Sequence, residues 1–333
     1  MKNHLLPLLL LPVLLLAGCR EGPASSAGSG DPGASSLPEE PLIVENLAVE
    51  LPRDLDTASA RAAMEGLPAL LAPHGVTVGQ VSVTFGTSYA ATAAALDQGG
   101  VQLAFLPAAD FVQFCHTALP VLADAEQEEA AGTSALICAG PSEYGARLAE
   151  LSQRRSLTWT ELDHARWGVL DRDSLAGYQC LELWLEDNCQ GNGVGDLTSV
   201  TAYDSWEDLL RGAAREEIDL FPLGWDQTAF YAPLWTVEEN RTGDGGLRGF
   251  GRQRPMETEV RSIAETQRLY RFVAAVTPGD QVLASERFQT ALSDALARAF
   301  DGPAESRAAI GADRCLPVQP EDLDGLRRLL FGT

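Results

Sequence analysis

Three short loops carry the residues whose chemistry is easiest to interpret. Each is predicted to join a strand to a helix, at residues 86–89, 173–178 and 203–206. A helix N-terminus offers unpaired amides and a partial positive charge, so such loops suit an anionic or polar group. In an open parallel sheet they gather at the carboxyl ends of the strands, where ligands usually bind. The sequence therefore predicts a binding site for a small polar or anionic molecule.

Each loop places a hydroxyl near an aromatic ring. The pairs are Ser88 with Tyr89, Ser174 with Tyr178, and Ser205 with Trp206. Taken singly, each serine is most simply a helix cap, because serine readily accepts a hydrogen bond from the first free amides of a helix. Each aromatic residue fits a core position as well as it fits a binding surface. Three such loops facing one cleft favour binding.

Catalytic motifs are missing from the sequence. It contains no Gly-x-Ser-x-Gly elbow, no His-Glu-x-x-His and no Gly-x-x-x-x-Gly-Lys phosphate loop. His74, His116 and His164 adjoin none of the three loops, and no Cys/His spacing is typical of zinc. We therefore expect a protein that is not an enzyme and that uses neither a metal nor a cofactor.

The elements that must hold these loops repeat along the chain. Residues 81–85 alternate like a strand, 90–98 form an alanine-rich helix, and 101–106 form a second, buried strand. This is a βαβ unit of a parallel sheet. A similar pattern recurs 117 residues later without a gap, from residue 199. A true duplication and a generic βαβ pattern explain the recurrence equally well.

Further patterns complete two α/β lobes. Strands are predicted at 167–170 and 272–276, and helices at 175–185, 288–300 and 320–330. We place lobe 1 at residues 41–135 plus 277–333, and lobe 2 at residues 136–276.

The N-terminus has the pattern of an export signal. A basic start precedes an apolar run over residues 5–16, which is too short to span a bilayer. Leu16-Ala17-Gly18-Cys19 resembles the lipobox of bacterial lipoproteins, which implies cleavage after residue 18 and lipidation of Cys19; an ordinary signal peptide with a chance cysteine is the alternative. Residues 19–40 are rich in Gly, Ser, Ala and Pro, which predicts a flexible tether.

Net charge limits the kinds of partner that the protein can bind, and the cysteine content limits its possible disulfides. The 333 residues carry 24 basic and 47 acidic side chains, a net charge of −23. Nucleic-acid binding needs a basic face, so no nucleic acid is expected. Five cysteines follow Cys19, and export makes disulfides possible, with Cys180 and Cys189 the nearest pair in sequence.

Together these motifs resemble the phosphate, phosphite and phosphonate substrate-binding proteins of ABC transporters. The resemblance runs from about Leu47 to Leu330, and its strongest stretch is residues 86–91 followed by the strand at 101–107. It implies an α/β, two-lobed type II periplasmic-binding-protein fold with a hinge and an interlobe ligand cleft. It also implies capture of a small solute outside the cytoplasm, for delivery to an ABC permease and its ATPase.

The resemblance also implies a set of binding residues, because family members hold an oxyanion with helix N-termini, hydroxyls and a tyrosine. By position these residues are Thr87, Ser88, Tyr89, Asp110, Ser174, Gly177, Tyr178, Ser205, Trp206 and Asp226. Two family hydroxyls are replaced, by Leu175 and Ala176. Each donor lost from a buried site costs roughly 1–3 kcal/mol, so a pure phosphonate site would be weakened.

Two carboxylates point to another kind of ligand. In the family, acidic residues at the far end of the cleft can receive an amino group. Asp110 and Asp226 occupy nearby loop positions in this sequence. We therefore hypothesise a small polar ligand, an oxyanion or a zwitterion, whose apolar part is enclosed by Trp206, Trp225 and Tyr89. A helix-cap role after Pro107 is the alternative for Asp110.

Two functions follow from one fold. In the first, a monomer anchored to the bacterial membrane by lipid supplies solute to a transporter. In the second, the same fold presents its ligand to a membrane receptor or kinase. A hydrolase is a third alternative.

Overall fold

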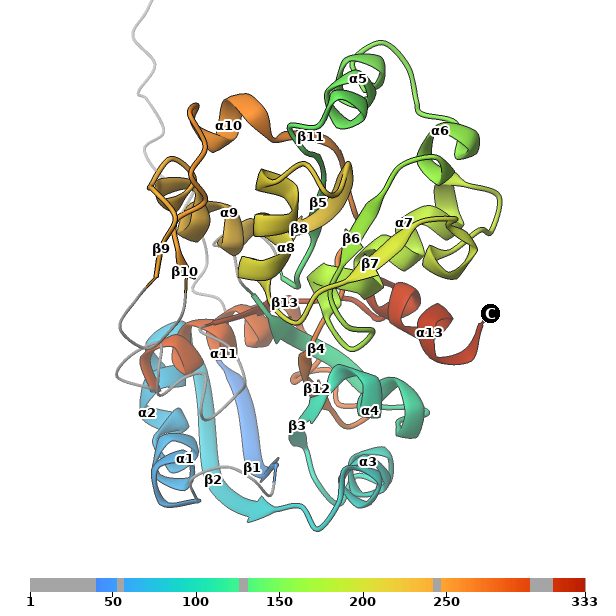
Figure 1. The fold of residues 1–333 in the computed structure, drawn as a ribbon. Coiled ribbons are helices and arrows are strands. Elements are labelled where there is room, and N and C mark those ends of the chain that lie inside the picture. Colours follow the sequence, from blue (N-terminus) through green and yellow to red (C-terminus); the bar gives the residue numbers. More distant parts are fainter. Residues whose placement is uncertain (1–39, 53–56, 126–130, 242–246, 300–313, 333) are drawn as a thin grey trace, which may run out of the picture. The chain divides into compact units, whose positions relative to one another are not determined.

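Two mixed β-sheets and the helices around them organise the chain (Figure 1). The computed structural model describes residues 40–52, 57–125, 131–241, 247–299 and 314–332. The predicted signal segment, Cys19 and the tether up to residue 39 lie outside the described residues. Within the described ranges, no helix has both the length and the apolar character needed to cross a membrane.

The first sheet has six strands in the order β13-β4-β12-β3-β1-β2. They are β1 (Leu42–Leu51), β2 (Val76–Phe85), β3 (Leu103–Pro107), β4 (Leu119–Asp124), β12 (Phe272–Val276) and β13 (Cys315–Pro317). β1 pairs in parallel with β2 and β3, whereas β12 runs antiparallel to both β3 and β4. The strands β1 and β3 are rich in Leu, Val and Phe side chains that are buried, as expected for the centre of a sheet covered by helices.

The second sheet has five strands in the order β11-β5-β8-β6-β7. They are β5 (Ala135–Ala139), β6 (Trp167–Val169), β7 (Val200–Ala202), β8 (Leu220–Gly224) and β11 (Arg261–Glu265). β6 is parallel to β7 and β8, and β5 is antiparallel to β8 and β11. A separate ribbon consists of β9 (Asn240–Arg241) and β10 (Leu247–Arg248).

The two sheets share one plan. Ordered from one edge, the first reads β2-β1-β3-β12-β4 and the second β7-β6-β8-β5-β11. In each, the antiparallel strand next to the third parallel strand has just arrived from the other sheet. The chain therefore crosses twice, between β4 and β5 and between β11 and β12. This confirms the two-lobed type II periplasmic-binding-protein fold.

Helices cover both sheets. The α-helices are α1 (Thr57–Glu65), α2 (Leu67–Leu71), α3 (Tyr89–Asp97), α4 (Ala108–Phe114), α5 (Glu143–Ser152), α6 (Trp159–Asp163), α7 (Cys180–Asn188), α8 (Trp206–Ala214), α9 (Trp225–Tyr231), α10 (Met256–Glu259), α11 (Glu286–Ala299) and α13 (Asp324–Phe331). Short turns of other helix types are η1 (Ala72–His74), η2 (Leu175–Gln179), η3 (Val194–Asp196), η4 (Ala232–Leu234) and η5 (Pro320–Leu323).

The recurrence 117 residues apart corresponds to equivalent elements. The series β2, α3, β3, α4 occupies the same places in the first sheet as β7, α8, β8, α9 in the second. The predicted βαβ architecture is therefore confirmed in both copies. Strand pairing assigns β12 to the first sheet, and the lobe limits at residues 135 and 276 stay predictions.

Among the described residues, four apolar clusters hold the lobes and their junction. In the first lobe Phe105 of β3 and Phe288 of α11 pack together with α2, and in the second Trp167 is fully buried under α6 and α7. A third region joins the lobes, because it includes Phe111 of α4, Leu183 of α7 and the terminal helix α13.

The cysteines lie mostly in these cores. Cys138, Cys189 and Cys315 are buried free thiols, so the Cys180–Cys189 disulfide that the sequence allowed does not form. Burial raises the pKa of the Cys138 and Cys315 thiols to about 12, which makes both unreactive at neutral pH.

Candidate ligand-binding site

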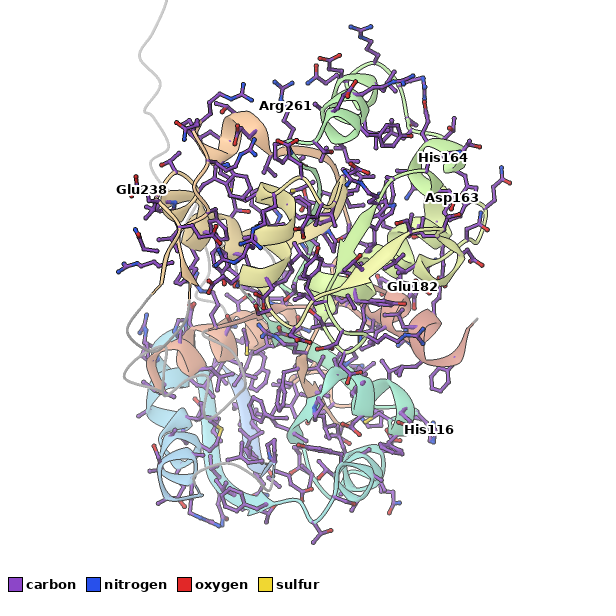
Figure 2. The ribbon with its side chains drawn as sticks, viewed as in Figure 1. His116, Asp163, His164, Glu182, Glu238 and Arg261 are labelled. Atoms are coloured by element: carbon purple, nitrogen blue, oxygen red, sulfur yellow. The ribbon has the colours of Figure 1, made fainter. Side chains whose placement is uncertain are left out.

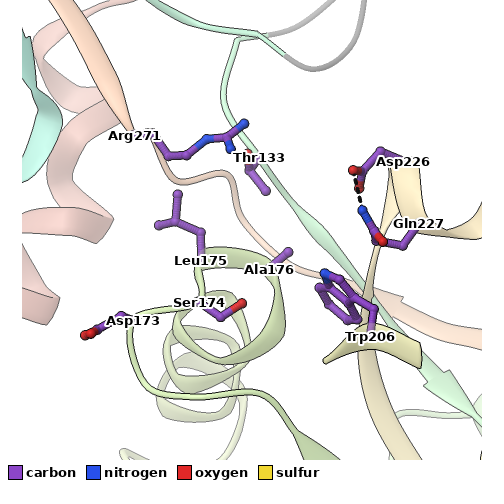
Figure 3. A pocket seen from close by; sticks show the side chains of 9 residues that line it. All are labelled: Thr133, Asp173, Ser174, Leu175, Ala176, Trp206, Asp226, Gln227 and Arg271. Atoms are coloured by element: carbon purple, nitrogen blue, oxygen red, sulfur yellow. Dashed lines mark hydrogen bonds between the residues drawn. The ribbon is translucent and has the colours of Figure 1, made fainter. Parts of the chain in front are cut away.

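A pocket of about 350 Å³ opens at the carboxyl ends of the parallel strands of the second sheet. It is lined by Thr133, Asp173, Ser174, Leu175, Ala176, Trp206, Asp226, Gln227 and Arg271 (Figure 3). Three strand-to-helix connections meet there, after β6, β7 and β8. This is the location at which open α/β sheets bind ligands.

The first wall of the pocket is the start of the helix that follows β6. The Ser174 hydroxyl accepts a hydrogen bond from the amide of Gly177 at 3.1 Å, so the predicted cap is confirmed. Residues 175–179 form a π-turn that continues into α7. Leu175 and Ala176 line the pocket at the first turn, where helix amides have no intrahelical partner.

Gly177 lets this turn approach the end of β6. A Cβ atom on it would lie 2.6 Å from Ser174 Oγ and 2.7 Å from Leu170 Cβ. The amide of Leu170 donates to the Gly177 carbonyl at 3.1 Å, which fixes the approach. Gly177 is buried behind the pocket lining, where it positions Ser174.

The second wall comes from α8. Ser205 caps this helix, accepting from the Asp208 amide at 3.1 Å and donating to Asp208 Oδ2 at 2.7 Å. The half-buried indole of Trp206 follows and forms one side of the pocket (Figure 3). The pocket therefore has one broad aromatic surface and a set of polar groups around it.

Two carboxylates stand at the pocket. Asp226, in the first turn of α9, is exposed, and its Oδ2 accepts from Gln227 Nε2 at 2.6 Å. Asp173 is exposed as well, and its amide donates to Asp171 Oδ1 at 2.9 Å. Both acidic side chains suit a ligand group that is cationic or a hydrogen-bond donor.

Two residues of the lining come from the segments that join the lobes. Thr133 precedes β5 and Arg271 precedes β12. Neither was among the candidates from sequence. No local signal marks them, because their proximity depends on a bridge between Thr133 and Leu269, which lie far apart in the chain.

The first-lobe candidates do not line this pocket. Ser88 caps α3, accepting from the Ala91 amide at 3.2 Å, and Thr87 beside it is exposed. Tyr89 packs on the apolar region that joins the lobes. Asp110 lies in the first turn of α4, and burial raises the pKa of its carboxyl.

Tyr178 lies away from the lining too. It packs against the core of the second lobe, with the Arg172 guanidinium 6.0 Å from its ring centroid. Burial, followed by the charge of Glu182, raises the pKa of its hydroxyl. Of the ten candidates, the structure thus brings together Ser174, Trp206 and Asp226.

Metal-binding side chains are dispersed. Figure 2 shows His116 on one lobe and His164, next to Asp163, on the other. Within the described ranges, no group of three or more His, Cys, Asp or Glu side chains is arranged to hold a metal ion.

Comparison with models of known protein families gives a match over most of the chain. Residues 74–323 match a family model described as ABC transporter, phosphonate, periplasmic substrate-binding protein. No curated protein matches the chain.

Solved structures similar to this chain include three bacterial proteins. One from Xanthomonas citri, bound to ATP, has 13% identity over 86% of this chain and 95% of its own, with a TM-score of 0.42. PhnD1 from Prochlorococcus marinus, in complex with methylphosphonate, has 10% identity over 86% of this chain and 97% of its own, with a TM-score of 0.34. A binding protein component of an ABC phosphonate transporter from Pseudomonas aeruginosa has 13% identity over 87% of this chain and 86% of its own, with a TM-score of 0.34.

Proposed function

Because this chain belongs to the family of periplasmic substrate-binding proteins of phosphonate ABC transporters, we propose that the pocket on its second lobe holds the transported ligand. Proteins of this family capture a small ligand outside the cytoplasm for a membrane permease. One observation carries the assignment to this pocket: Ser174, Trp206 and Asp226 follow three different strands and converge on it.

The residues that line the pocket are complementary to a small ligand with more than one polar group. The start of the helix at Ser174 suits an anionic group, since its first amides and partial positive charge face outward. Asp226 and Asp173 suit an amino group, and the indole of Trp206 suits a short apolar linker or a cation above its face. We propose a zwitterion that joins an oxyanion to an amine as the ligand class.

Loops of the first lobe complete the site when the lobes close. Thr87 and Ser88 precede α3, Tyr89 is its first residue, and Asp110 lies in the first turn of α4. These places correspond to those of Ser205, Trp206 and Asp226 in the second lobe. Closure of the two segments between the lobes would bring these groups over a bound ligand.

The N-terminal sequence supports attachment to the membrane as part of this proposal. We propose that the chain is cleaved before Cys19, lipidated there and held outside the cytoplasm as a monomer that serves a permease and its ATPase. The Cys19→Ser variant should leave the membrane fraction and fail to incorporate labelled fatty acid. A variant that stays membrane-bound would contradict the lipid anchor.

We also propose that the protein binds without turnover, so that ligand recovered from it is chemically unchanged. The binding test is titration calorimetry of the full chain with 2-aminoethylphosphonate, methylphosphonate and inorganic phosphate. The aminophosphonate should bind at least tenfold more tightly than the other two, and Asp226→Asn should remove that preference. Tight phosphate binding that neither Asp226→Asn nor Asp110→Asn alters would contradict the zwitterion.

A further inference from the structure

The Thr133 hydroxyl is a buried polar group of the pocket. Thr133 is only 4% exposed, and its side chain lines the pocket. Among the described residues, none offers Thr133 Oγ1 a hydrogen-bond partner. A buried hydroxyl without a partner destabilises the protein that contains it. A ligand group in the pocket can supply the missing partner.

The backbone holds this hydroxyl rigidly. The Thr133 amide donates to the Leu269 carbonyl at 2.7 Å, and the Leu269 amide donates back at 2.9 Å. This bridge joins the two segments that connect the lobes, two residues before Arg271. The positions of Thr133 and Arg271 are therefore fixed relative to each other.

Arg271 supplies the positive charge of the site. Among the described residues that line the pocket, it is the one cation. Its amide donates to Asp124 Oδ1 at 2.8 Å, and its Nε lies 3.5 Å from Asp124 Oδ2. Figure 3 shows the guanidinium extending toward Thr133. A buried carboxylate thus anchors the arginine at its base while the planar group reaches the pocket.

We propose that Thr133 and Arg271 form the anion subsite of this pocket, so that the ligand's oxyanion is held by the segments between the lobes. This rests on the proposed function of the pocket. The guanidinium offers parallel N–H donors to two oxygens of one anion, and Thr133 Oγ1 donates to one of them. Phosphonates and carboxylates both present such a pair of oxygens. The carboxylate of Asp226, in the first turn of α9, then faces the amino end of the ligand.

This subsite supplies the hydrogen-bond donors that the second-lobe loop lacks. Leu175 and Ala176 offer no side-chain donor beside Ser174. An arginine and a threonine from the connecting segments restore donors at the same pocket. The anion then contacts the part of the chain that must bend when the lobes close.

The test uses the full chain and a matched pair of probes, 2-aminoethylphosphonate and β-alanine, which differ in their oxyanion. Thr133→Val and Arg271→Gln should each weaken binding of the preferred probe at least tenfold, while Thr133→Ser should restore it to within about threefold. A preference for β-alanine identifies the anion as a carboxylate, and the reverse preference identifies a phosphonate; either supports the subsite.

Two results separate this inference from the proposed function. If the wild-type chain binds a probe and Asp226→Asn weakens it, but Thr133→Val and Arg271→Gln do not, the anion subsite is wrong and the pocket stands. If the wild-type chain binds no probe, the proposed ligand class fails together with the subsite.

A ligand-free measurement tests the unpartnered hydroxyl directly. Thr133→Val keeps the shape of the side chain and removes the oxygen, so the unliganded variant should melt at the same temperature as the wild type or higher. A lower melting temperature would mean that the hydroxyl already has a partner, which overturns the inference.

Discussion

Arg271 and Asp124 join the two segments that connect the lobes. Asp124, the last residue of β4, accepts hydrogen bonds from the amides of Arg271 and Phe272 at 2.8 and 2.9 Å. Its Oδ2 lies 3.5 Å from Arg271 Nε. The carboxylate is almost fully buried, whereas about half of the arginine side chain is exposed. One buried acid therefore fixes both the start of β12 and a cation of the pocket.

The first prediction concerns the ionisation of Asp124. Burial raises the pKa of this carboxyl, and the bonds from Phe272 and Arg271 offset the rise only in part. A raised pKa means that the folded state binds the proton more tightly than the unfolded state. The contribution is favourable below about pH 3.8 and is lost as pH rises through the folded pKa. The wild type should therefore lose stability relative to Asp124→Asn as pH increases from 3.5 to 7.

Urea unfolding of both proteins at a series of pH values measures this trend. Asp124→Ala serves as the contrast, since it removes both amide contacts and should cost roughly 2–4 kcal/mol at pH 7. A difference between wild type and Asp124→Asn that does not change with pH would refute the assignment.

The second prediction concerns Asp219, whose contribution to stability has the opposite pH dependence to that of Asp124. Its carboxylate accepts from Arg166 Nη2 at 2.7 Å, from Arg166 Nε at 3.0 Å and from the Ser142 hydroxyl at 2.6 Å. Burial alone would raise the pKa of Asp219, but the bonds from Arg166 and Ser142 outweigh burial and lower it. Its stabilisation is present above about pH 3.8 and disappears as pH falls through the folded pKa.

Asp219→Asn should consequently cost about 2–4 kcal/mol at pH 7, since a buried partner of an arginine loses its charge. The gap to the wild type should close as pH falls below about 4. Glu257→Gln, on the exposed side of α10, is the matched control and should change the free energy of unfolding by less than about 0.5 kcal/mol. Equal effects from the two variants would argue against the assignment.

Local sequence patterns predicted the strand-to-helix loops well, for a physical reason. A serine cap depends on residues three positions apart, and a strand depends on alternation within a few residues. Ser88, Ser174 and Ser205 therefore cap their helices as expected. The equivalence of the two βαβ copies was readable in the same way, because each copy is a local unit.

The contribution of the two connecting segments to the site could not be predicted from local sequence patterns. Thr133 and Arg271 are brought together by a bridge to Leu269 and by the buried acid Asp124, all set by tertiary pairing. A lone threonine and an arginine before a strand have no local pattern that indicates a site. The prediction that Asp110 reaches the ligand also depends on the arrangement of both lobes, which no local pattern determines.

The third prediction tests how closely the η2 turn must approach β6. In Gly177→Ala, the new Cβ would lie 2.7 Å from Leu170 Cβ, so the turn must shift away. Overpacking of this kind costs roughly 1–3 kcal/mol. Because the shift also moves Ser174, ligand affinity should fall by at least tenfold. Thermal melts and calorimetry measure the two effects.

Gly195→Ala is the control for this change. Nothing lies within 4 Å of a Cβ at that position, which is on the short turn η3. Its melting temperature and ligand affinity should match those of the wild type. A Gly177→Ala protein with unchanged affinity would show that the turn has no part in positioning the site.

The last prediction distinguishes two tryptophans that the sequence treated alike. Trp206 lines the pocket, whereas Trp225 is 41% exposed and donates from Nε1 to Glu265 Oε1 at 3.4 Å. Removing the aromatic wall exposes the apolar part of the ligand and removes any cation contact above the ring. Trp206→Ala should therefore weaken binding at least tenfold, or about 1.4 kcal/mol, with a small change in melting temperature. Trp225→Ala should leave affinity within about twofold. Calorimetry with 2-aminoethylphosphonate measures both, and an equal loss in the two variants would instead support enclosure of the ligand by Trp225 in the closed state.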